Sequence, residues 1–332
     1  MLAVGVGPFL ASASQVEQPP GHHPKIALIS VIGCLDDEHI QTLRALGDVT
    51  VLGPLSEKQA LDTLKGIDIV VASPYAVPLN KTVLESTDTL KLLVSDTTGL
   101  DRVDLAAASG KGIRVANVPN YSTDAVAEFT FGLLLAGIRH IPQAEATERH
   151  GQFETPKSDL KYVGFELAGK TLGVVGLGSI GIRVAEIGRG FGMNVIAWDR
   201  SPKKVDGITQ LSLEQVLSQS DVVSLNLALN KDTAGIVNAA HLRLMKPTAI
   251  LVNMARAELV DETALYDALH DGKIAGAALD VLTVMDVSNP LLTLDNVIVS
   301  PHLAYDTRES QFRCAESVVA TVRNFIAGTP KT

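Results

Sequence analysis

The sequence predicts an α/β protein made of two doubly wound domains, each built on a mainly parallel sheet. Three observations lead to this class. The chain has 332 residues, enough for about two domains of ordinary size. Hydrophobic residues make up 46% of it and aromatic residues only 4%, a balance that favours parallel sheets covered by helices over an aromatic-rich β-sandwich. From Lys25 onward, short β-branched runs alternate with segments of helical periodicity, which is the pattern of βαβ units.

Charge and cysteine content exclude several classes of partner. The chain contains 28 Lys and Arg against 37 Asp and Glu, a net charge of −9. This balance argues against nucleic acid or an anionic membrane surface and favours a small-molecule substrate. Cys34 and Cys314 lie far apart in the sequence, so we expect no disulfide framework and no cysteine-based metal site. Reduced thiols are typical of the cytoplasm, where we expect the protein to act.

Residues 1–24 are expected to form a disordered or loosely packed extension. Residues 1–14 are apolar but lack the basic segment of a secretory signal. A stretch rich in Pro follows, and its histidines, His22 and His23, are interpreted as linker residues rather than metal ligands. No apolar run is long enough to span a membrane.

The elements from residue 25 to residue 118 predict a first α/β domain. Helices are expected over residues 37–46 and 56–65 between the strands. The predicted strands are 25–30, 49–53, 67–73, 90–97 and 113–118. A long apolar helix is predicted over residues 122–140, with Ser122 or Thr123 as N-cap. Its polar face is thin, so we expect a partner to cover it.

A second set of alternating elements predicts a second α/β domain. Its predicted strands are 171–175, 194–199, 221–227, 249–254, 274–280 and 297–300. The helical pattern at residues 307–326 has no strand after it. This last helix is therefore predicted to pack on the first domain.

A glycine motif follows the first strand of the second set. Gly176, Gly178 and Gly181 form G-x-G-x-x-G directly after the strand, and a helix is predicted over residues 182–191. The first glycine would permit the tight turn, the second a close approach of pyrophosphate, and the third close packing of helix on strand. Ser179 and Ile180 would offer backbone N–H groups to the phosphates at the helix N-terminus.

Asp199 ends the next predicted strand, 18 residues past the last glycine, where a carboxylate can bind a ribose 2′-hydroxyl. An acid there favours NAD over NADP because it repels a 2′-phosphate. Arg200, Lys203 and Lys204 reduce this preference, since basic residues tolerate a phosphate. The alternative interpretation is an ordinary strand-to-helix turn followed by a solvated acid. The combined pattern predicts a Rossmann cofactor domain.

Several further stretches resemble one known family. They are residues 98–104, 117–122, 252–256, 278–281 and 300–302. Together with the glycine motif, they resemble the D-isomer-specific 2-hydroxyacid dehydrogenases, over nearly all of residues 25–328. Residues 280–282, 289–292 and 301–304 are most similar to the glycerate dehydrogenase and hydroxypyruvate reductase branch.

The resemblance implies a particular domain arrangement. A flavodoxin-like substrate domain would comprise residues 25–118 and 304–332, and the Rossmann cofactor domain, residues 119–303, would be inserted in it. It also implies a homodimer in which the helix after Ser122 packs across the interface.

Arg256 and His302 are the predicted catalytic residues. Each follows a predicted strand, and the carboxyl ends of parallel strands face the ligand crevice. A guanidinium fork suits a planar carboxylate, and an imidazole suits proton transfer near neutral pH. The resemblance gives Arg256 the substrate-binding role and His302 the role of general acid and base. The alternative interpretation of Arg256 is a surface arginine in a salt bridge.

The resemblance also implies the remaining site residues. Thr98 and Gly99 would bind the substrate carboxylate through backbone N–H groups, although a plain turn is the alternative there. Tyr121 is a candidate for lining the substrate pocket. Asp280 would accept a hydrogen bond from the nicotinamide carboxamide. Ala255 and Arg200 are further candidate cofactor contacts.

One position departs from the family pattern. The family usually has a glutamate five residues after the aspartate at position 280, and this chain has Met285 there. That carboxylate normally raises the pKa of the histidine by stabilising its charged form. Asp286 or Asp306 could replace it, or His302 could act without a carboxylate. The sequence leaves these alternatives open.

The sequence thus predicts an NAD-dependent oxidoreductase that transfers a hydride between nicotinamide and a small 2-oxo or 2-hydroxy acid, such as glyoxylate, hydroxypyruvate or glycerate. No metal is expected. The alternative is an NAD(H)-binding sensor or regulatory protein with weakened catalysis, whose only support is Met285. A phosphoglycerate-type substrate is disfavoured, because no basic cluster for a second phosphate is evident in the N-terminal domain.

Overall fold

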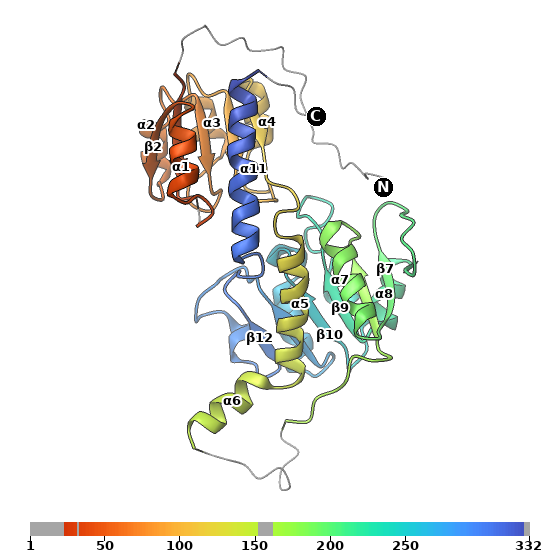
Figure 1. Cartoon of the computed structure of the whole chain (residues 1–332). Coiled ribbons are helices and arrows are strands. Elements are labelled where there is room, and N and C mark those ends of the chain that lie inside the picture. The colour runs from red at the N-terminus through yellow and green to blue at the C-terminus, as the bar shows by residue number, and fades with distance from the viewer. Residues whose placement is uncertain (1–22, 32, 152–161, 329–332) are drawn as a thin grey trace. The chain divides into compact units, whose positions relative to one another are not determined.

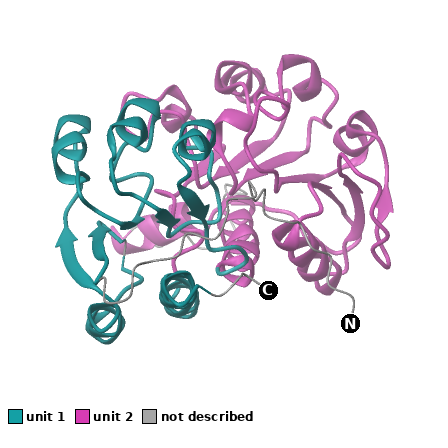
Figure 2. Ribbon diagram, turned by 90° about the horizontal axis from the view of Figure 1, so that it is seen from above, with its two compact units in different colours: residues 1–121, 307–332 teal, residues 122–306 magenta. Residues whose placement is uncertain are grey.

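The computed structural model describes residues 23–31, 33–151 and 162–328, and it divides into two compact units. Unit 1 comprises Met1–Tyr121 and Thr307–Thr332, and unit 2 comprises Ser122–Asp306 (Figure 2). The predicted domain boundaries lie three residues before these divisions. The predicted extension falls outside the described residues except for His23 and Pro24. Two parallel sheets with helices confirm the predicted fold class.

Unit 1 has a five-stranded parallel sheet in the order β2-β1-β3-β4-β5, which is the flavodoxin-like order. Its strands are β1 (Lys25–Ile29), β2 (Asp48–Leu52), β3 (Ile69–Ala72), β4 (Leu92–Ser95) and β5 (Arg114–Ala116). Its helices are α1 (Asp37–Arg44), α2 (Glu57–Thr63), α3 (Lys81–Ser86), α4 (Leu105–Gly110) and α11 (Arg308–Ile326). β1, β3 and β4 are buried almost throughout, which explains their continuous apolar sequences.

The C-terminal helix α11 belongs to unit 1, where it contacts α1 and β4 (Figure 1). Thr307 and Ser310 form a capping box at its start. The Cys314 thiol on its buried face donates a hydrogen bond to the Asp96 carbonyl at 3.3 Å. Hydrogen bonding with the Cys34 thiol and burial raise the pKa of Cys314, so it remains a protonated structural thiol.

Unit 2 has a seven-stranded parallel sheet in the order β12-β11-β10-β9-β6-β7-β8. Its strands are β6 (Thr171–Val175), β7 (Asn194–Trp198), β8 (Thr209–Gln210), β9 (Val222–Leu225), β10 (Ile250–Asn253), β11 (Gly276–Leu279) and β12 (Val297–Val299). The direction of strand order reverses between β6 and β9, and doubly wound sheets bind ligands at such a point.

The helices of unit 2 are α5 (Thr123–Ile138), α6 (Ile141–Arg149), α7 (Ser179–Gly190), α8 (Leu213–Gln219), α9 (Ala239–Leu242), α10 (Glu262–His270) and the short 3-10 helices η1 (Ala257–Leu259) and η2 (Pro290–Thr293). Helices lie on both faces of the sheet, whereas α6 contacts α5 and buries none of its residues. Among the described residues, none of the helices is both long enough and apolar enough to cross a membrane.

The thin polar face of α5 is explained by its packing within unit 2. Eight of its 16 residues are buried, and it packs on α7 and on β10, β11 and β12 of the same unit (Figure 1). Ser122 occupies the predicted N-cap position but forms no side-chain capping bond. Much of the apolar surface of α5 is thus covered within the chain.

Candidate dinucleotide and active site

The glycine turn after β6 has the close contacts that the motif predicts. Gly176 has a φ of +101°, which favours glycine, and a Cβ there would lie 2.7 Å from the Asn226 carbonyl oxygen. A Cβ at Gly181 would lie 1.9 Å from the Gly176 carbonyl oxygen, so only glycine fits. A Cβ at Gly178 would meet nothing within 4 Å. Gly176 and Gly181 are therefore required by packing, whereas Gly178 leaves open space that a bound group can fill.

Helix α7 begins at Ser179, three residues earlier than predicted, because the motif itself forms the first turn. Its N-cap is Gly178, which has no side chain to satisfy the first N–H groups. Gly178 and Ser179 are exposed, and Ile180 is half-buried. An uncapped, exposed N-terminus of a 12-residue helix fits a pyrophosphate by hydrogen bonding and by the helix dipole.

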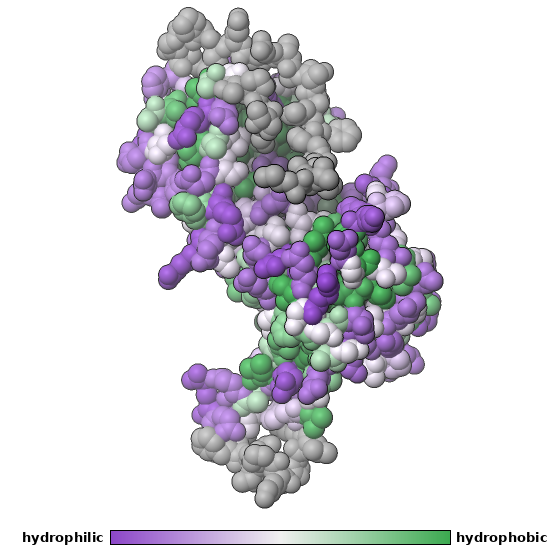
Figure 3. Space-filling model, turned by 45° about the vertical axis from the view of Figure 1, so that its right-hand side comes forward, coloured by the Kyte–Doolittle hydropathy of each residue, from purple (hydrophilic) through white to green (hydrophobic). Residues whose placement is uncertain are grey.

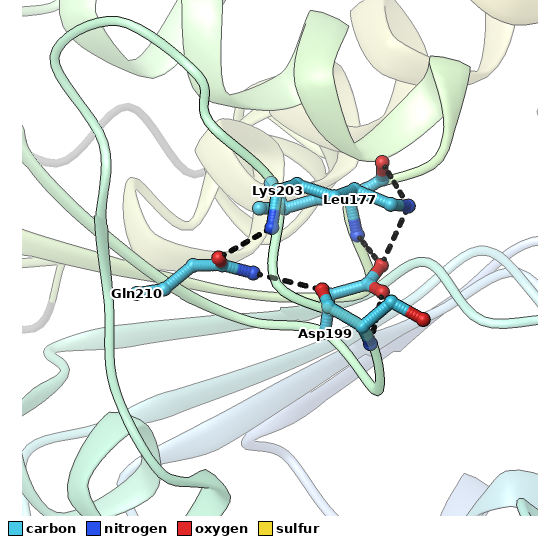
Figure 4. A network of polar contacts seen from close by, with 5 residues as sticks. Leu177, Asp199, Lys203 and Gln210 are labelled. Atoms are coloured by element: carbon cyan, nitrogen blue, oxygen red, sulfur yellow. Dashed lines mark hydrogen bonds and ion pairs between the residues drawn. The ribbon is translucent and has the colours of Figure 1, made fainter. Parts of the chain in front are cut away.

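Asp199 lies directly after β7 and faces the glycine turn (Figure 4). Its Oδ2 accepts hydrogen bonds from Leu177 N at 2.8 Å and Lys203 Nζ at 2.9 Å, and its Oδ1 accepts from Ser201 N at 3.0 Å. Burial raises the pKa of Asp199, but these three donors outweigh burial and hold it below the ordinary value. Asp199 is therefore a carboxylate at neutral pH, beside the turn that would hold the cofactor.

Arg256 follows β10 and is positioned by a buried asparagine. Asn253 is 1% exposed, donates from Nδ2 to the Arg256 carbonyl at 2.8 Å and accepts from Ala255 N at 3.0 Å. The Arg256 Nη1 donates to the Ala255 carbonyl at 2.9 Å, and the side chain is half-buried. The turn thus orients a guanidinium at the carboxyl end of its strand.

Asp280 organises the turn that contains His302. Its fully buried carboxylate accepts from Ser300 Oγ at 2.6 Å, Leu303 N at 2.8 Å and Ala304 N at 2.9 Å. Its carbonyl accepts from His302 N at 2.9 Å. These bonds hold His302 in a left-handed conformation with a φ of +57°. The predicted contact of Asp280 with nicotinamide stays a prediction.

The structure brings most predicted residues of unit 2 to one edge of its sheet. β10, β11 and β12 are neighbours, so Arg256, Asp280 and His302 follow three adjacent strands. Asp280 N donates to the Asn253 carbonyl at 3.0 Å, which joins the first two turns directly. The His302 ring lies edge-on to Tyr305, with ring centroids 5.7 Å apart. The glycine turn lies at the same carboxyl edge, after β6.

The loop after β11 contains the departure from the family pattern. Met285 is 49% exposed. Asp286 accepts hydrogen bonds from Ser288 N at 2.7 Å and Ser288 Oγ at 2.5 Å, which lower the pKa of Asp286. Asp286 thus bonds within its own turn, which disfavours it as the replacement for the glutamate.

Glu262 at the start of α10 positions this loop. Its carboxylate accepts from both the backbone N and the side chain of Thr283, and from Asn289 Nδ2 at 3.3 Å. The sequence pattern did not single out Glu262 as a site residue. An acid directly after the helix N-cap Asp261 is the only local signal, and that signal explains a helix start equally well.

In unit 1, Thr98 and Gly99 lie on a hydrogen-bonded loop after β4, and Tyr121 follows β5. Thr98 Oγ1 donates to the Val118 carbonyl at 3.0 Å, and Asn117 Nδ2 donates to the Thr98 carbonyl at 2.6 Å. Within the described part of the chain, the backbone N–H groups of Thr98 and Gly99 have no acceptor. Tyr121 is buried, and its carbonyl accepts from Arg313 Nε at 2.7 Å. The two N–H donors are thus available for an anion.

This fold and site define a nicotinamide-dinucleotide-dependent oxidoreductase: a doubly wound sheet with the glycine turn, a strand-end carboxylate, and an arginine and a histidine at the same sheet edge. Residues 131–304 match the family model described as D-isomer specific 2-hydroxyacid dehydrogenase, NAD binding domain. The chain belongs to the D-isomer-specific 2-hydroxyacid dehydrogenase family.

Three known proteins illustrate the similarity. The D-3-phosphoglycerate dehydrogenase of Methanocaldococcus jannaschii is 38% identical over 306 residues, which are 90% of this chain but only 57% of that protein. The glyoxylate reductase of Korarchaeum cryptofilum is 36% identical over 83% of this chain and 84% of its own length. A solved acyclic imino acid reductase, in complex with NADPH and D-Arg, has a TM-score of 0.85 and 33% identity over 92% of this chain and 98% of its own.

These similarities confirm the predicted family, the oxidoreductase class and NAD as cofactor. Each of the three relatives is named as an enzyme, and none of them supports the regulatory alternative. The chain spans just over half of the phosphoglycerate dehydrogenase, so that enzyme's substrate is not transferred to this chain.

Proposed function

We propose that this protein reduces small 2-oxo acids such as glyoxylate and hydroxypyruvate, and oxidises the corresponding 2-hydroxy acids. Arg256 binds the substrate carboxylate and polarises the carbonyl, and His302 donates a proton to the forming alkoxide. Gly176–Gly181 and Asp199 hold the dinucleotide, whose nicotinamide supplies or accepts the hydride. Thr98 and Gly99 offer N–H donors to the substrate carboxylate, and Tyr121 lines the pocket.

The single observation that supports this function most strongly is the bracing of His302. A non-glycine residue in the left-handed region costs free energy, about 1–3 kcal/mol, and such strain is concentrated at functional sites. Here the buried Asp280 fixes that conformation with four hydrogen bonds to the turn. His302 is thereby held at the carboxyl edge of the sheet by a buried side chain, as a general acid requires.

The test is oxidation of NADH by glyoxylate, hydroxypyruvate, pyruvate and a branched 2-oxo acid from pH 5 to pH 8. We expect His302→Ala to lose at least about a hundredfold in kcat, the contribution of a general acid, while NADH binding is retained. His270→Ala is the matched control, because this exposed histidine ends α10 away from the sheet edge. Equal activity of His302→Ala and wild type would refute the role of His302.

Met285 favours a second candidate function, the reduction of imino acids. An iminium carbon accepts hydride without prior protonation, since its nitrogen already bears the proton and the positive charge. If a carboxylate kept the imidazole of His302 protonated, that cation would lie beside the cationic iminium and repel it. A methionine at position 285 avoids this repulsion. The solved imino acid reductase is a precedent within this fold. Faster NADH or NADPH oxidation by pyruvate with ammonia or methylamine than by pyruvate alone would support this candidate, and no acceleration at any pH would reject it.

We further propose that the protein acts as a cytoplasmic homodimer. The two cysteines are free thiols, which favours a reducing compartment. Helix α6 has nine residues and buries none of them, and its Ile141 is 54% exposed. A helix this short is only marginally stable in water without packing partners. A second copy of the chain that covers α6 would supply such partners. Figure 3 shows polar and apolar side chains mixed on the face of the molecule that includes this segment. Sedimentation of wild type and Ile141→Asp tests the dimer, which the charge should weaken.

A further inference from the structure

We propose that Lys203 determines cofactor choice: it neutralises Asp199 and binds the 2′-phosphate of NADP(H), so the site accepts both nicotinamide dinucleotides. The inference rests on the proposed function, in which the glycine turn and Asp199 hold the dinucleotide. It concerns one side chain in the network of Figure 4.

The acceptor positions of Asp199 are nearly used up. A carboxylate has about four lone-pair positions, two on each oxygen. The Oδ2 atom accepts from Leu177 N and Lys203 Nζ, and Oδ1 accepts from Ser201 N. About one position is left, whereas a ribose diol offers two hydroxyl donors. Lys203 therefore competes with the ribose of NAD(H) for the carboxylate.

The donor positions of Lys203 leave room for an anion. An ammonium has three N–H donors. Lys203 Nζ donates to Asp199 Oδ2 at 2.9 Å and to the Leu177 carbonyl at 2.8 Å. Among the described residues it has no third acceptor, and its side chain is 31% exposed. A phosphate oxygen can thus take the third donor without breaking the ion pair.

Gln210 fixes Lys203 in this place before any ligand binds. Its Oε1 accepts from Lys203 N at 2.8 Å, and its Nε2 donates to the Ser201 carbonyl at 3.4 Å. Gln210 lies on β8, which pairs with β7 through Ala197. The turn after Asp199 is therefore tied back to the sheet, and its ammonium is pre-organised beside the glycine turn.

The local charge also favours a 2′-phosphate. An isolated aspartate would repel this group, which has a charge of about −1.5 to −2. The Lys203 ammonium cancels the charge of Asp199, and Arg200 adds an exposed cation. Within the described chain Arg200 forms no ion pair. The repulsion expected from Asp199 alone is thus reversed by its neighbours.

Direct binding to the full chain tests the proposal without turnover. The probes are NADH, NADPH, adenosine 5′-monophosphate and adenosine 2′,5′-bisphosphate, titrated by calorimetry. Wild type should bind NADPH within about tenfold of NADH, and the bisphosphate more tightly than the monophosphate. Lys203→Met should weaken NADPH and the bisphosphate at least about tenfold, which corresponds to one charge-assisted hydrogen bond. It should tighten NADH, because it frees an acceptor on Asp199.

Lys204→Met is the matched control, since it removes the same charge one residue further on. It should change every affinity less than about threefold, as expected for an exposed charge. Lys203→Arg should preserve the ratio of NADPH to NADH affinity, and thermal unfolding of each variant checks the fold. Asp199→Asn should tighten NADPH and weaken NADH.

Three results would overturn the inference alone: equal effects of Lys203→Met and Lys204→Met, equal loss of NADH and NADPH binding in Lys203→Met, or no preference of wild type for the bisphosphate over the monophosphate. Failure of wild type to bind NADH, NADPH or either nucleotide would instead overturn the proposed function, and this inference with it.

Discussion

At the residue scale, Asp280 both stabilises its turn and positions the predicted catalytic residue His302. Its carboxylate has no exposed surface and satisfies two backbone N–H groups and one hydroxyl of the turn that ends in Ala304. Leaving a buried donor without its acceptor costs more free energy than an ordinary hydrogen bond contributes. The same carboxylate therefore stabilises the fold and orients His302.

Replacing Asp280 by Asn should reduce both the stability of the protein and its catalytic rate. The amide NH₂ would face a donor of the turn, so we expect a loss of about 2–4 kcal/mol in the free energy of unfolding. Denaturant unfolding measures this loss, and kcat should fall in the same variant because the His302 turn loosens. Asp295→Asn, at an exposed site, serves as control and should change stability by less than about 0.5 kcal/mol. A stable, fully active Asp280→Asn protein would contradict the bracing role.

At the same scale, we expect the residue at position 285 to affect the pH dependence of the reaction. Introducing Glu at this position should place a carboxylate beside His302 and raise the pKa of the imidazole, because the carboxylate stabilises the charged form. Reduction of a 2-oxo acid needs the protonated histidine, so the fall in kcat/KM with rising pH should move to higher pH. Met285→Gln controls for polarity without charge. Identical pH profiles for Met285→Glu and Met285→Gln would show that position 285 does not tune the histidine.

At the element scale, the start of α7 depends on a close approach of two backbone segments. A Cβ at Gly181 would clash with the Gly176 carbonyl, whereas Gly190, in the same helix, has open space around it. We expect Gly181→Ala to destabilise unit 2 by at least about 2 kcal/mol and to abolish NADH binding, by overpacking at the turn. Gly190→Ala should be neutral or stabilising by up to about 1 kcal/mol, since alanine favours helix. Thermal unfolding and NADH titration of the pair provide the comparison.

Asp221 joins the starts of neighbouring strands in the same unit. It accepts from Thr171 N at 2.8 Å and from Lys246 Nζ at 2.9 Å. Burial raises the pKa of Asp221, but the hydrogen bonds to Lys246 and Thr171 outweigh burial and lower it. A depressed pKa in the folded state contributes stability above the unfolded pKa, about 3.9, and this contribution is lost as pH falls through the folded value.

Wild type should therefore lose stability between about pH 5 and pH 3 more steeply than Asp221→Asn. At pH 7 the variant should be less stable by about 1 kcal/mol, a figure discounted for the partial exposure of Lys246. Urea unfolding across this range measures both. Parallel pH dependences for the two proteins would exclude a contribution from Asp221.

At the scale of the whole molecule, the two units have separate cores. In unit 1 an apolar cluster of described residues includes Ile29, Val70 and Leu93, and in unit 2 two clusters lie on the two sides of the sheet. The single tryptophan, Trp198, lies in unit 2, directly before Asp199. Its fluorescence therefore reports unfolding of the unit to which we assign the dinucleotide.

NADH at a hundred times its dissociation constant should stabilise the Trp198-monitored transition by about 2.7 kcal/mol, because the ligand binds only the folded unit. The same experiment with Gly181→Ala serves as control and should show no shift. An unchanged transition in wild type at saturating NADH would contradict the assignment of the cofactor site to unit 2.

Most strands and helices could be predicted from the sequence, and the exceptions have physical reasons. Eleven of the twelve described strands lie at predicted places. The buried ones among them, such as β3, β9 and β10, are apolar runs, and the others are short β-branched segments such as β2 and β12. The two-residue strand β8 was missed, since Thr209 and Gln210 have no apolar pattern and pair only through their backbone. Helix α7 begins at Ser179 rather than Ile182, because glycines lower the apparent helical propensity of its first turn.

By itself the sequence determined the two α/β sheets, the family, the glycine motif and the identities of Arg256, Asp280 and His302, since each depends on local pattern and spacing. Only the tertiary structure decided how these residues are held. Asn253 bonds to the Arg256 carbonyl, and Asp280 accepts from the turn that contains His302. Glu262 accepts from Thr283 in the loop of Met285, and Lys203 pairs with Asp199. Such pairings depend on which strand ends become neighbours and on directed hydrogen bonds. Their physical cause is three-dimensional, because a carboxylate selects partners by distance and angle, not by position along the chain.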